Sequence, residues 1–386
     1  MIRPAINNQI LGVDKVLLMV VGALLAIGAI MVFSASVGVQ GSSAYEADRY
    51  FDMFRRISKH VASIFVGLIV LATVSCIKIQ IWRKISKGLF LLAILLLAML
   101  LLPGIGREIN GSTRWFSIGS FSMQPAEFLK VTVILFLSDY LVRNKKEIKS
   151  FVTAIIKPAL PLGLVSFLCL LQPDYGSTAL VLFVALGILF LSGVRLIYIC
   201  GAIIAVSGIL FLLIFFFDHA LERLLCYQDP FADATGCGYQ LVQALIAVGS
   251  GEWFGVGLGS SVQKLFYIPH ANNDFLVAVI AEELGFLGIM ILVSLYGVLL
   301  WRIFEIARKS FMRGDLFSAL VAQGIGLLLS IQMMIHFAVN FGVVPTKGLT
   351  MPLMSAGGSS MVASCFAVGL LFSIDKANRG TRKMTP

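Results

Sequence analysis

Long apolar runs alternate with short polar segments along most of this 386-residue chain. A membrane-spanning helix needs about 20 mostly apolar residues, and the pattern predicts ten such helices. They cover roughly residues 16–33, 61–77, 87–103, 124–142, 153–171, 176–193, 196–217, 274–300, 316–340 and 354–374. Segments of about ten alternating apolar and polar residues, typical of transmembrane β-strands, are not seen. The chain is therefore predicted to be an all-α polytopic membrane protein, with one integral membrane domain over residues 1–386.

Composition supports this prediction. The chain is 59% hydrophobic and only 13% charged, whereas soluble domains carry about 25% charged residues. The fifth and sixth predicted helices are separated only by residues 172–176, which the proline and glycine there predict to be a tight turn. We find no soluble domain, low-complexity tract or internal repeat between the helices.

The distribution of basic residues predicts the topology. Of the 30 Lys and Arg residues, 19 fall in one set of connections and termini and 9 in the opposite set. By the positive-inside rule, both termini are predicted to be cytoplasmic. The largest loop, about 218–273 between the seventh and eighth helices, is then extracytoplasmic. Topology accounts for most of the net charge of +10, so nucleic acid is not expected as a partner.

The cysteines and aromatic residues describe this large loop further. None of the six cysteines is in C-x-x-C spacing, so no zinc or thioredoxin motif is present. Cys226 and Cys237 both lie in the loop, where a disulfide and two free thiols are equally compatible with the sequence. Trp253 and Phe254 lie among glycines, which suits a segment at the membrane interface.

The most informative stretch is 261–285, which runs from a polar segment directly into an apolar helix. Asp274 lies at the junction, and Glu282 and Glu283 lie inside the apolar run. One interpretation is that Asp274 caps the helix that Phe275 begins. The other is a functional carboxylate, because a carboxylate at or below a membrane surface is a functional-site hypothesis by default.

Two further segments could contribute to a site. Glu127 and Lys130 share a face of the fourth helix at i,i+3, as a self-neutralising buried pair or as the polar lining of a cavity. Either interpretation turns this face toward the interior of the bundle. Arg114, beside Trp115, is either an interfacial anchor or a phosphate ligand.

The segment after the ninth helix, 340–360, contains two prolines, four glycines and several hydroxyl residues. This composition predicts broken helix, which survives at membrane depth only where it lines a cavity or is buried in protein. Amide-rich turns of this kind also bind anions. The outward-facing segments together therefore indicate a site for an anionic amphiphile.

Seven motifs in order make the chain similar to the SEDS family (shape, elongation, division and sporulation proteins), and to its division type more than its elongation type. The matching residues are Gln124-Pro125-Ala126-Glu127-Phe128-x-Lys130, Gln172-Pro173-Asp174-Tyr175-Gly176, Asp229-Pro230, Gly238-Tyr239-Gln240, Gly255-x-Gly257-x-Gly259 with Ser261-Val262-Gln263-Lys264-Leu265, Asp274-Phe275 with Glu282-Glu283-x-Gly285, and Pro345-Thr346-Lys347-Gly348-Leu349-Thr350 with Gly357-Gly358-Ser359-Ser360. The likeness runs nearly end to end. The chain departs from the family at 270–273, before the acidic residue, and at Ala356, where a tyrosine is usual.

The resemblance implies a peptidoglycan glycosyltransferase that polymerises lipid II on the outer face of the bacterial inner membrane, at the division septum. It implies Asp274 as the general base. The leaving pyrophosphate would be held by Arg114, Lys130, Lys264 or Lys347, which the sequence does not rank, with or without a divalent Mg or Mn ion. Glu127, Gln263 and Ser359 are the other expected substrate-binding residues, and no metal-ligating residue is assigned.

The expected partners are lipid II, a class B penicillin-binding protein and other membrane proteins of the divisome. The chain itself has no S-x-x-K followed by a folded soluble domain, so a transpeptidase must come from elsewhere. Two other functions stay open at this point. One is transport of lipid II across the membrane, and the other is a scaffold that recruits division proteins without catalysis.

Overall fold

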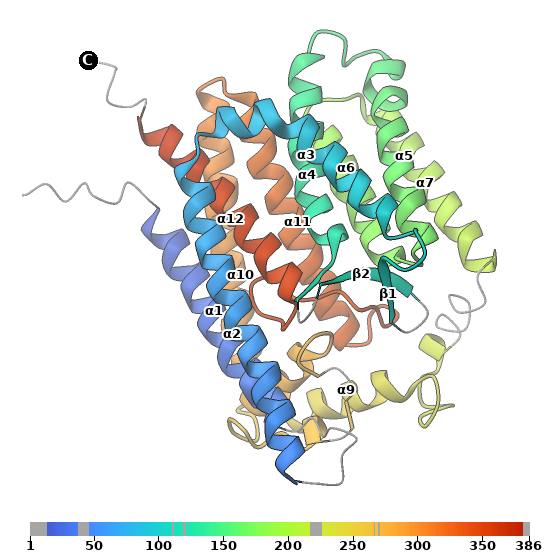
Figure 1. Cartoon of the computed structure of the whole chain (residues 1–386), viewed down its shortest axis with the longest axis vertical. Helices are drawn as coiled ribbons and strands as arrows, with labels where there is room; N and C mark the ends of the chain where they lie inside the picture. The colour runs from blue at the N-terminus through green and yellow to red at the C-terminus, as the bar shows by residue number, and fades with distance from the viewer. Residues whose placement is uncertain are drawn as a thin grey trace, which may run out of the picture.

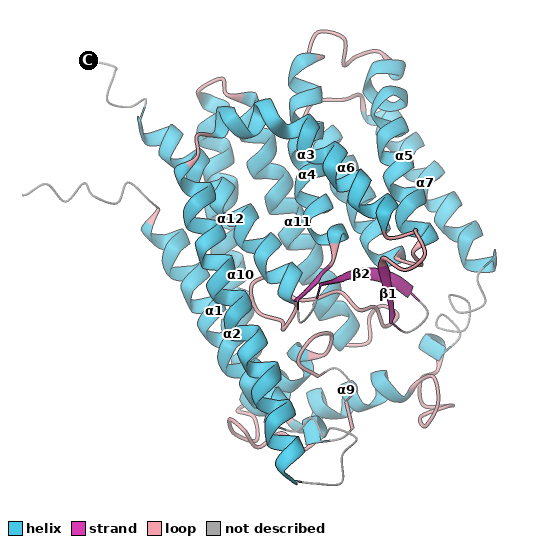
Figure 2. Ribbon diagram, in the orientation of Figure 1, coloured by secondary structure: helices cyan, strands magenta, loops and turns pink. Residues whose placement is uncertain are grey.

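The computed structural model describes residues 14–37, 46–109, 112–118, 121–216, 226–265, 267–268 and 271–380. Within these ranges long helices lie side by side in a bundle (Figures 1 and 2). The long helices are α1 (Lys15–Val37), α2 (Glu46–Cys76), α3 (Ile79–Met99), α4 (Pro125–Arg143), α5 (Lys157–Leu171), α6 (Tyr175–Leu191), α7 (Leu196–Phe216), α10 (Leu276–Met312), α11 (Leu316–Asn340) and α12 (Gly358–Gly380). The shorter helices are the π-helix η1 (Val152–Ile156), α9 (Tyr239–Ser250) and the 3₁₀-helix η2 (Gln263–Leu265).

Each of the ten predicted spans overlaps one of these long helices, although several helices begin or end elsewhere, such as α2 and α10. In the described part of the chain, six helical segments are long and apolar enough to cross a membrane. These segments are Lys15–Ser36, Met53–Cys76, Val152–Leu171, Leu276–Met312, Leu316–Asn340 and Gly358–Gly380. The prediction of a helical protein with several membrane spans is therefore confirmed.

The prediction of an all-α chain needs one correction. Between α3 and α4 the strands β1 (Gly106–Ile109), β2 (Ser112–Ile118) and β3 (Phe121–Met123) form an antiparallel sheet in the order β1-β2-β3. The sequence of β2, Ser-Thr-Arg-Trp-Phe-Ser-Ile, is rich in the aromatic and β-branched residues that favour strands. This sheet, in the connection between the third and fourth predicted spans, carries Arg114.

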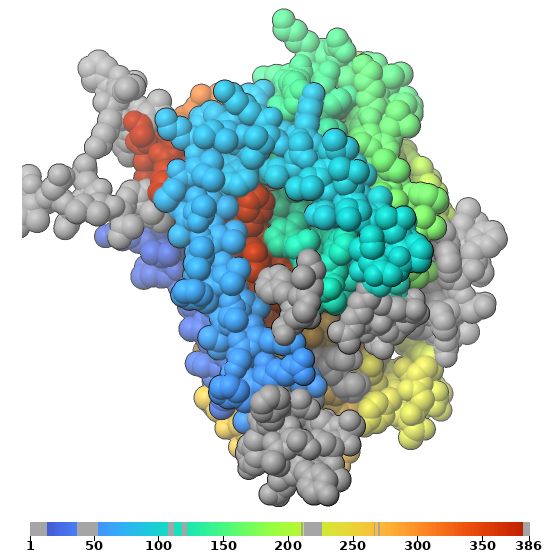
Figure 3. All heavy atoms as spheres, in the orientation of Figure 1, coloured from blue at the N-terminus to red at the C-terminus, as the bar shows by residue number. Residues whose placement is uncertain are grey.

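Helix α12 lies along α2, and the two helices run in the same direction. Glycines permit the close approach: a Cβ added at Gly67 of α2 would lie 2.8 Å from Cys365 Sγ. A Cβ added at Gly369 of α12 would lie 3.0 Å from the Leu71 carbonyl. In the space-filling view, atoms of α12 are visible in a narrow strip beside α2 (Figure 3). This packing fixes the position of the first turn of α12, which belongs to the site described below.

Helix α10 is interrupted at Gly285, whose φ of 65° and ψ of −165° are not helical. The loop that follows α9 hydrogen-bonds to both sides of the break. Before the break, the Val256 amide donates to the Glu282 carbonyl (2.9 Å). The Gly257 amide donates to the Glu283 carbonyl (3.1 Å). After the break, the amides of residues 286 and 287 donate to carbonyls of the same loop (2.9 and 3.1 Å). Non-helical backbone is tolerated at this depth because protein groups satisfy it.

Candidate functional site

Asp274 lies in the turn that leads into α10, and α10 begins at the end of the bundle where α9 is found (Figure 1). It is half-buried. The segment 345–353, which follows α11, passes directly beside its side chain. A Cβ added at Gly348 would lie 3.2 Å from Asp274 Oδ2. The glycine therefore lets the backbone approach the carboxylate more closely than a larger residue would.

The first turn of α10 is held by a residue that the sequence analysis did not single out. The N-cap residue, Phe275, makes no side-chain cap hydrogen bond. Instead, Asn340 Oδ1 at the end of α11 accepts from the Ala278 amide (2.9 Å), and Asn340 Nδ2 donates to the Asp274 carbonyl (3.0 Å). Since another helix supplies the acceptor for the Ala278 amide, capping is not a sufficient reason for a carboxylate at position 274.

The broken-helix segment after α11 is tied to the turn that carries Asp274. The Ser355 hydroxyl donates to the Asn273 carbonyl (2.8 Å) and accepts from the Met351 amide (2.9 Å). The Ala356 amide donates to the Asn272 carbonyl (3.1 Å). These contacts hold non-helical backbone beside the carboxylate, which agrees with the expectation that the segment lines a site.

The start of α4 meets the start of α12 at the same end. The Gln124 amide donates to Ser359 Oγ (2.9 Å), and Ser359 is buried. One turn into α4, Lys130 Nζ donates to Glu127 Oε1 at 2.7 Å. Both side chains line a small cavity that also contacts Gln332 of α11 and Ser364 of α12. The prediction that Glu127 and Lys130 face the interior of the bundle is confirmed.

Lys264 forms a second buried ion pair. Its Nζ donates to Glu283 Oε1 (2.6 Å) and to the Ser34 hydroxyl of α1 (2.8 Å). The side chains of Lys264 and Glu283 are 1% and 0% exposed. Ser34 also donates to both oxygens of Glu283 (2.6 and 2.9 Å). The pair therefore joins η2 to α1 and α10.

Glu282 holds the neighbouring backbone. One of its oxygens accepts from the Ser261 hydroxyl (2.5 Å), and the other accepts from the amides of Val262 and Gln263 (2.9 and 3.3 Å). The Gln263 side chain is half-buried, and within the described residues its Oε1 has no hydrogen-bond partner. Glu282 and Glu283 thus both anchor the loop that leads to Asp274.

Arg114 of β2 binds the turn between α5 and α6. Its Nε donates to the Gln172 carbonyl (3.1 Å), and its Nη2 donates to the Pro173 carbonyl. Asp174 caps α6 by accepting from the Ser177 amide (3.2 Å). The tight turn predicted at 172–176 is confirmed, and Arg114 is engaged by carbonyl oxygens. Lys347 is exposed in the segment that passes Asp274.

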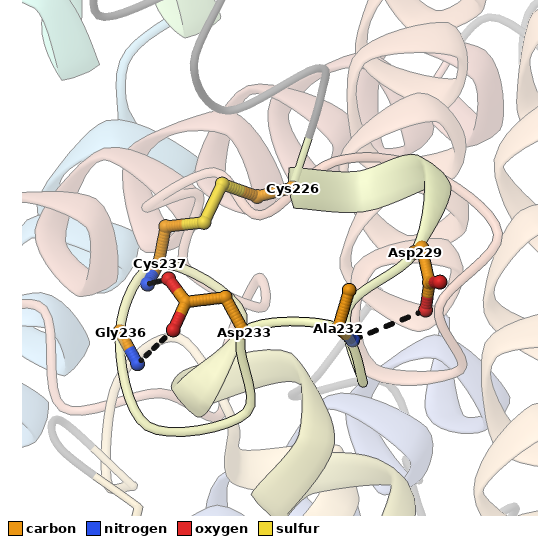
Figure 4. The surroundings of a disulfide bond; sticks show 6 residues. All are labelled: Cys226, Asp229, Ala232, Asp233, Gly236 and Cys237. Atoms are coloured by element: carbon orange, nitrogen blue, oxygen red, sulfur yellow. Dashed lines mark hydrogen bonds between the residues drawn. A yellow bond between two sulfur atoms is a disulfide. The ribbon is translucent and has the colours of Figure 1, made fainter.

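A disulfide joins Cys226 and Cys237, with Cα atoms 6.0 Å apart, which resolves the two alternatives left by the sequence (Figure 4). Inside the closed loop, Asp233 accepts from the amides of Gly236 and Cys237 (both 3.0 Å), and Asp229 accepts from an amide of its own turn. Other parts of the expected 218–273 loop, residues 218–225, 266 and 269–270, lie outside the described residues.

Within the described residues, no group of three or more His, Cys, Asp or Glu side chains is placed to hold a metal ion. A Mg²⁺ ion is usually bound through one or two carboxylates together with substrate phosphates and water. Asp274 would fit that role only as one ligand beside the oxygens of a bound pyrophosphate.

The fold and this arrangement define a polytopic helical membrane protein with an acidic site at one end of its bundle. The chain belongs to the cell cycle protein family of FtsW, RodA and SpoVE, which it matches over residues 14–380. It is therefore a multi-pass inner membrane protein, and the resemblance found in its motifs is confirmed.

Relatives and solved structures agree with the family assignment. The chain is 44% identical over 368 residues (95% of this chain and 91% of the relative) to a probable peptidoglycan glycosyltransferase FtsW of Hahella chejuensis. It is 40% identical over 378 residues (97% and 90%) to that of Aromatoleum aromaticum. A chain in a peptidoglycan synthase complex that coordinates polymerization and crosslinking has a TM-score of 0.75 at 28% identity, covering 95% of this chain and 99% of that one. For Thermus thermophilus RodA the values are 0.66 and 26%, covering 96% and 98%.

The sequence analysis missed Asn340, His336, Gln332 and Ser34, which all contact the site or its supports. A signal was present for the first three, because they are polar residues in an otherwise apolar span at i, i+4 and i+8 on one face of a helix.

Proposed function

We propose that the protein is a peptidoglycan glycosyltransferase that polymerises lipid II for septal cell-wall synthesis, with Asp274 as the general base. The observation that carries this proposal is the half-buried Asp274 carboxylate, with the Gly348 backbone packed beside it and its α10 turn held by Asn340. Full-length relatives with this activity in their names support it.

In the reaction, a sugar hydroxyl of the acceptor attacks the anomeric carbon of the donor. A glycosidic C–O bond forms, and the bond from that carbon to the lipid pyrophosphate breaks. Asp274 takes the hydroxyl proton during the attack, a contribution worth roughly 10²–10⁴ in rate. Undecaprenyl pyrophosphate leaves with the bonding electron pair, so it needs positive charge close to its oxygens.

Lys347 is the cation that best fits the leaving group. It is exposed and one residue from Gly348, which contacts the Asp274 carboxylate. Lys130 and Lys264 are buried, so they are less accessible to a bound pyrophosphate than Lys347 is. We assign Lys264 to holding the loop, and Glu127, Lys130, Gln263 and Ser359 to the lining of the substrate site. A divalent ion, if one is used, would be held by Asp274 together with pyrophosphate oxygens and would offset the negative charge of the leaving group.

The chemistry requires the site to face outward. We propose ten spans with both termini cytoplasmic, so that the 218–273 loop and Asp274 are extracytoplasmic; the 19-to-9 distribution of basic residues supports this topology. We expect an impermeant thiol reagent to label Ser260→Cys in intact cells, because Ser260 is exposed in that loop. Ser150→Cys, exposed in a basic connection, is the control that should label only after the membrane is opened. The reverse pattern would overturn the topology.

A class B penicillin-binding protein and other divisome membrane proteins are the proposed partners. A solved structure with the same fold is a synthase complex that coordinates polymerization and crosslinking, and no S-x-x-K of this chain is followed by a folded soluble domain. Glycan strands made here would be crosslinked by such a partner.

Transport of lipid II is the second candidate, because charged and polar side chains line a small cavity between α4, α11 and α12 and carriers bind their substrates at such intramembrane sites. Protein reconstituted with its partner in liposomes, together with labelled lipid II, separates the two functions. Polymer on a gel supports the enzyme, whereas lipid II that crosses the bilayer without polymer supports the carrier. If neither polymer nor transport of lipid II is observed, only the scaffold function remains.

Asp274→Asn tests the general base in the same assay. Asparagine keeps the shape and accepts hydrogen bonds, but it does not take up a proton, so polymerisation should fall by roughly 10²–10⁴ while lipid II binding remains. Asp233→Asn, which changes another carboxylate of the outer loop, is the matched control and should polymerise normally. Near-normal synthesis by Asp274→Asn would exclude Asp274 as the base.

A further inference from the structure

The end of α11 carries two buried polar side chains on one face, His336 and Asn340, four residues apart. They are 1% and 0% exposed. Buried polar groups in a membrane span carry a high desolvation cost unless they are hydrogen-bonded. Each of these side chains is bonded to a different one of the two segments that meet at Asp274.

Asn340 holds the segment that carries the carboxylate. Its Nδ2 donates to the Asp274 carbonyl (3.0 Å) and to the His336 carbonyl (2.7 Å), and its Oδ1 accepts from the Ala278 amide (2.9 Å). One side chain therefore bonds the backbone of Asp274 itself and the first turn of α10. Asn340 of α11 therefore fixes the backbone at Asp274 where the chain enters α10.

His336 holds the opposite segment. Its Nδ1 lies 2.8 Å from the Leu349 carbonyl. Because a carbonyl only accepts, Nδ1 carries the proton in this contact. Leu349 follows Gly348, whose added Cβ would lie 3.2 Å from Asp274 Oδ2. His336 thus holds the backbone that faces the carboxylate.

We propose that His336 and Asn340 are positioning residues for polymerisation: together they form an α11 clamp that sets the separation between the Asp274 carboxylate and the segment of Lys347 and Gly348. The proposal rests on Asp274 being the general base and Lys347 the cation for the leaving group. The base acts on the attacking hydroxyl and the cation acts on the leaving oxygen of the same displacement, so their separation must be held, because small displacements of reacting groups are costly in rate. The clamp supplies that separation from a rigid helix, while neither residue takes or gives a proton in the reaction.

Asn340→Ala tests the clamp through its effect on kcat. We expect kcat for polymerisation to fall roughly tenfold to 10²-fold, with the dissociation constant of labelled lipid II unchanged. Asn378→Ala is the matched control: Asn378 is also a buried amide, bonded to Ile306 and Ser310. It should lose comparable thermal stability without the loss of kcat. Wild-type kcat in Asn340→Ala, or a loss equal to that of Asn378→Ala, would overturn the clamp.

Two variants of His336 guard against misfolding. His336→Asn places an amide N–H near the position of Nδ1 and should keep most of the activity, whereas His336→Leu should lose it. Equal kcat in His336→Asn and His336→Leu would contradict the assignment of the Leu349 contact.

The outcome also separates the clamp from the general base. If Asp274→Asn is inactive and Asn340→Ala is fully active, the clamp hypothesis is wrong and the assignment of Asp274 as general base stands. A fully active Asp274→Asn would remove both. Loss of lipid II binding in Asn340→Ala, in step with the loss of kcat, would make Asn340 a substrate contact and overturn its positioning role.

Discussion

Charged side chains are arranged differently at the two ends of the bundle. At the end with the N-terminus of α1 and the C-terminus of α12, one carboxylate has several cations. Asp14 is bound by Arg302 and lies 3.8 Å from Arg379, and Arg379 also binds Asp375 at 2.8 Å. At the end with Asp274, each buried lysine has one carboxylate: Lys264 has Glu283, and Lys130 has Glu127.

The exposed fractions of the charged side chains show how strongly each arrangement depends on its ion pairs. The Arg379 side chain is 47% exposed, so its charge stays solvated and its ion pairs contribute little stability. The Lys264 side chain is 1% exposed, so its charge depends on Glu283 and Ser34. Arg379 at the first end therefore stays partly solvated, whereas the Lys264–Glu283 pair at the second end holds the loop that leads to Asp274.

The strongest test of this contrast is Lys264→Met. It leaves Glu283 buried without its partner, which should cost about 3–5 kcal/mol of unfolding free energy, measured by thermal unfolding in detergent. The double variant Lys264→Met/Glu283→Gln should recover much of the loss, because no buried charge remains. Lys309→Met at the other end removes a pair whose lysine is 44% exposed and should cost less than about 1 kcal/mol.

A different outcome would make Lys264 a candidate to hold the leaving pyrophosphate, as the resemblance implied. If Lys264→Met unfolds at the wild-type temperature but loses polymerisation, the lysine contacts substrate and does not merely hold the loop. The contrast between the two ends would then be one of function alone.

The Glu127–Lys130 pair should respond less strongly. Its cavity also contains Gln332 and Ser364, so a charge left alone there finds polar neighbours. We expect Lys130→Met or Glu127→Gln to cost about 1–3 kcal/mol, and the double variant to be more stable than the worse single. If the double variant regains stability but not polymerisation, both residues are substrate contacts as well as a structural pair.

Helix positions were predictable because each apolar run is long enough to indicate a membrane-spanning helix. The break in α10 was not, even though Gly285 was visible in the sequence. It depends on hydrogen bonds from residues 252–257, which a local pattern does not reveal. The small sheet at 106–123 was missed for a similar reason, since short strands carry little periodicity and are stabilised by their partners.

The same distinction applies to the site. Asp274, Glu127 and Lys130 were predictable, because a charge in or beside an apolar run is conspicuous. The pairing of Lys264 with Glu283 and Ser34 joins residues 19 and 230 positions apart, and no spacing rule leads to it. Asn340 bonds a residue 66 positions earlier, so its importance emerged only from the fold.

The smallest expected effect concerns Asp14, which caps α1 by accepting from the Leu17 amide (3.0 Å) and also binds Arg302. Asp315 caps α11 in the same way, accepting from the Ser318 amide (3.1 Å). Asparagine is as good a cap as aspartate, so Asp315→Asn should change stability by only a few tenths of a kcal/mol. Asp14→Asn should cost about 1–2 kcal/mol, because it also loses a charged hydrogen bond.

The dependence of this difference on pH tests its cause. Burial raises the pKa of Asp14, but the hydrogen bonds from Arg302 and the Leu17 amide outweigh it, so the pKa lies below its ordinary value of 3.8. A carboxyl with a lowered folded-state pKa stabilises the protein above its unfolded pKa, and the stabilisation is lost as pH falls through the folded value. The gap between wild type and Asp14→Asn, measured by thermal unfolding, should thus be full at pH 7 and shrink below pH 3.8. A gap that stays constant as the pH falls would mean that packing, not the charge on Asp14, stabilises this end of the bundle.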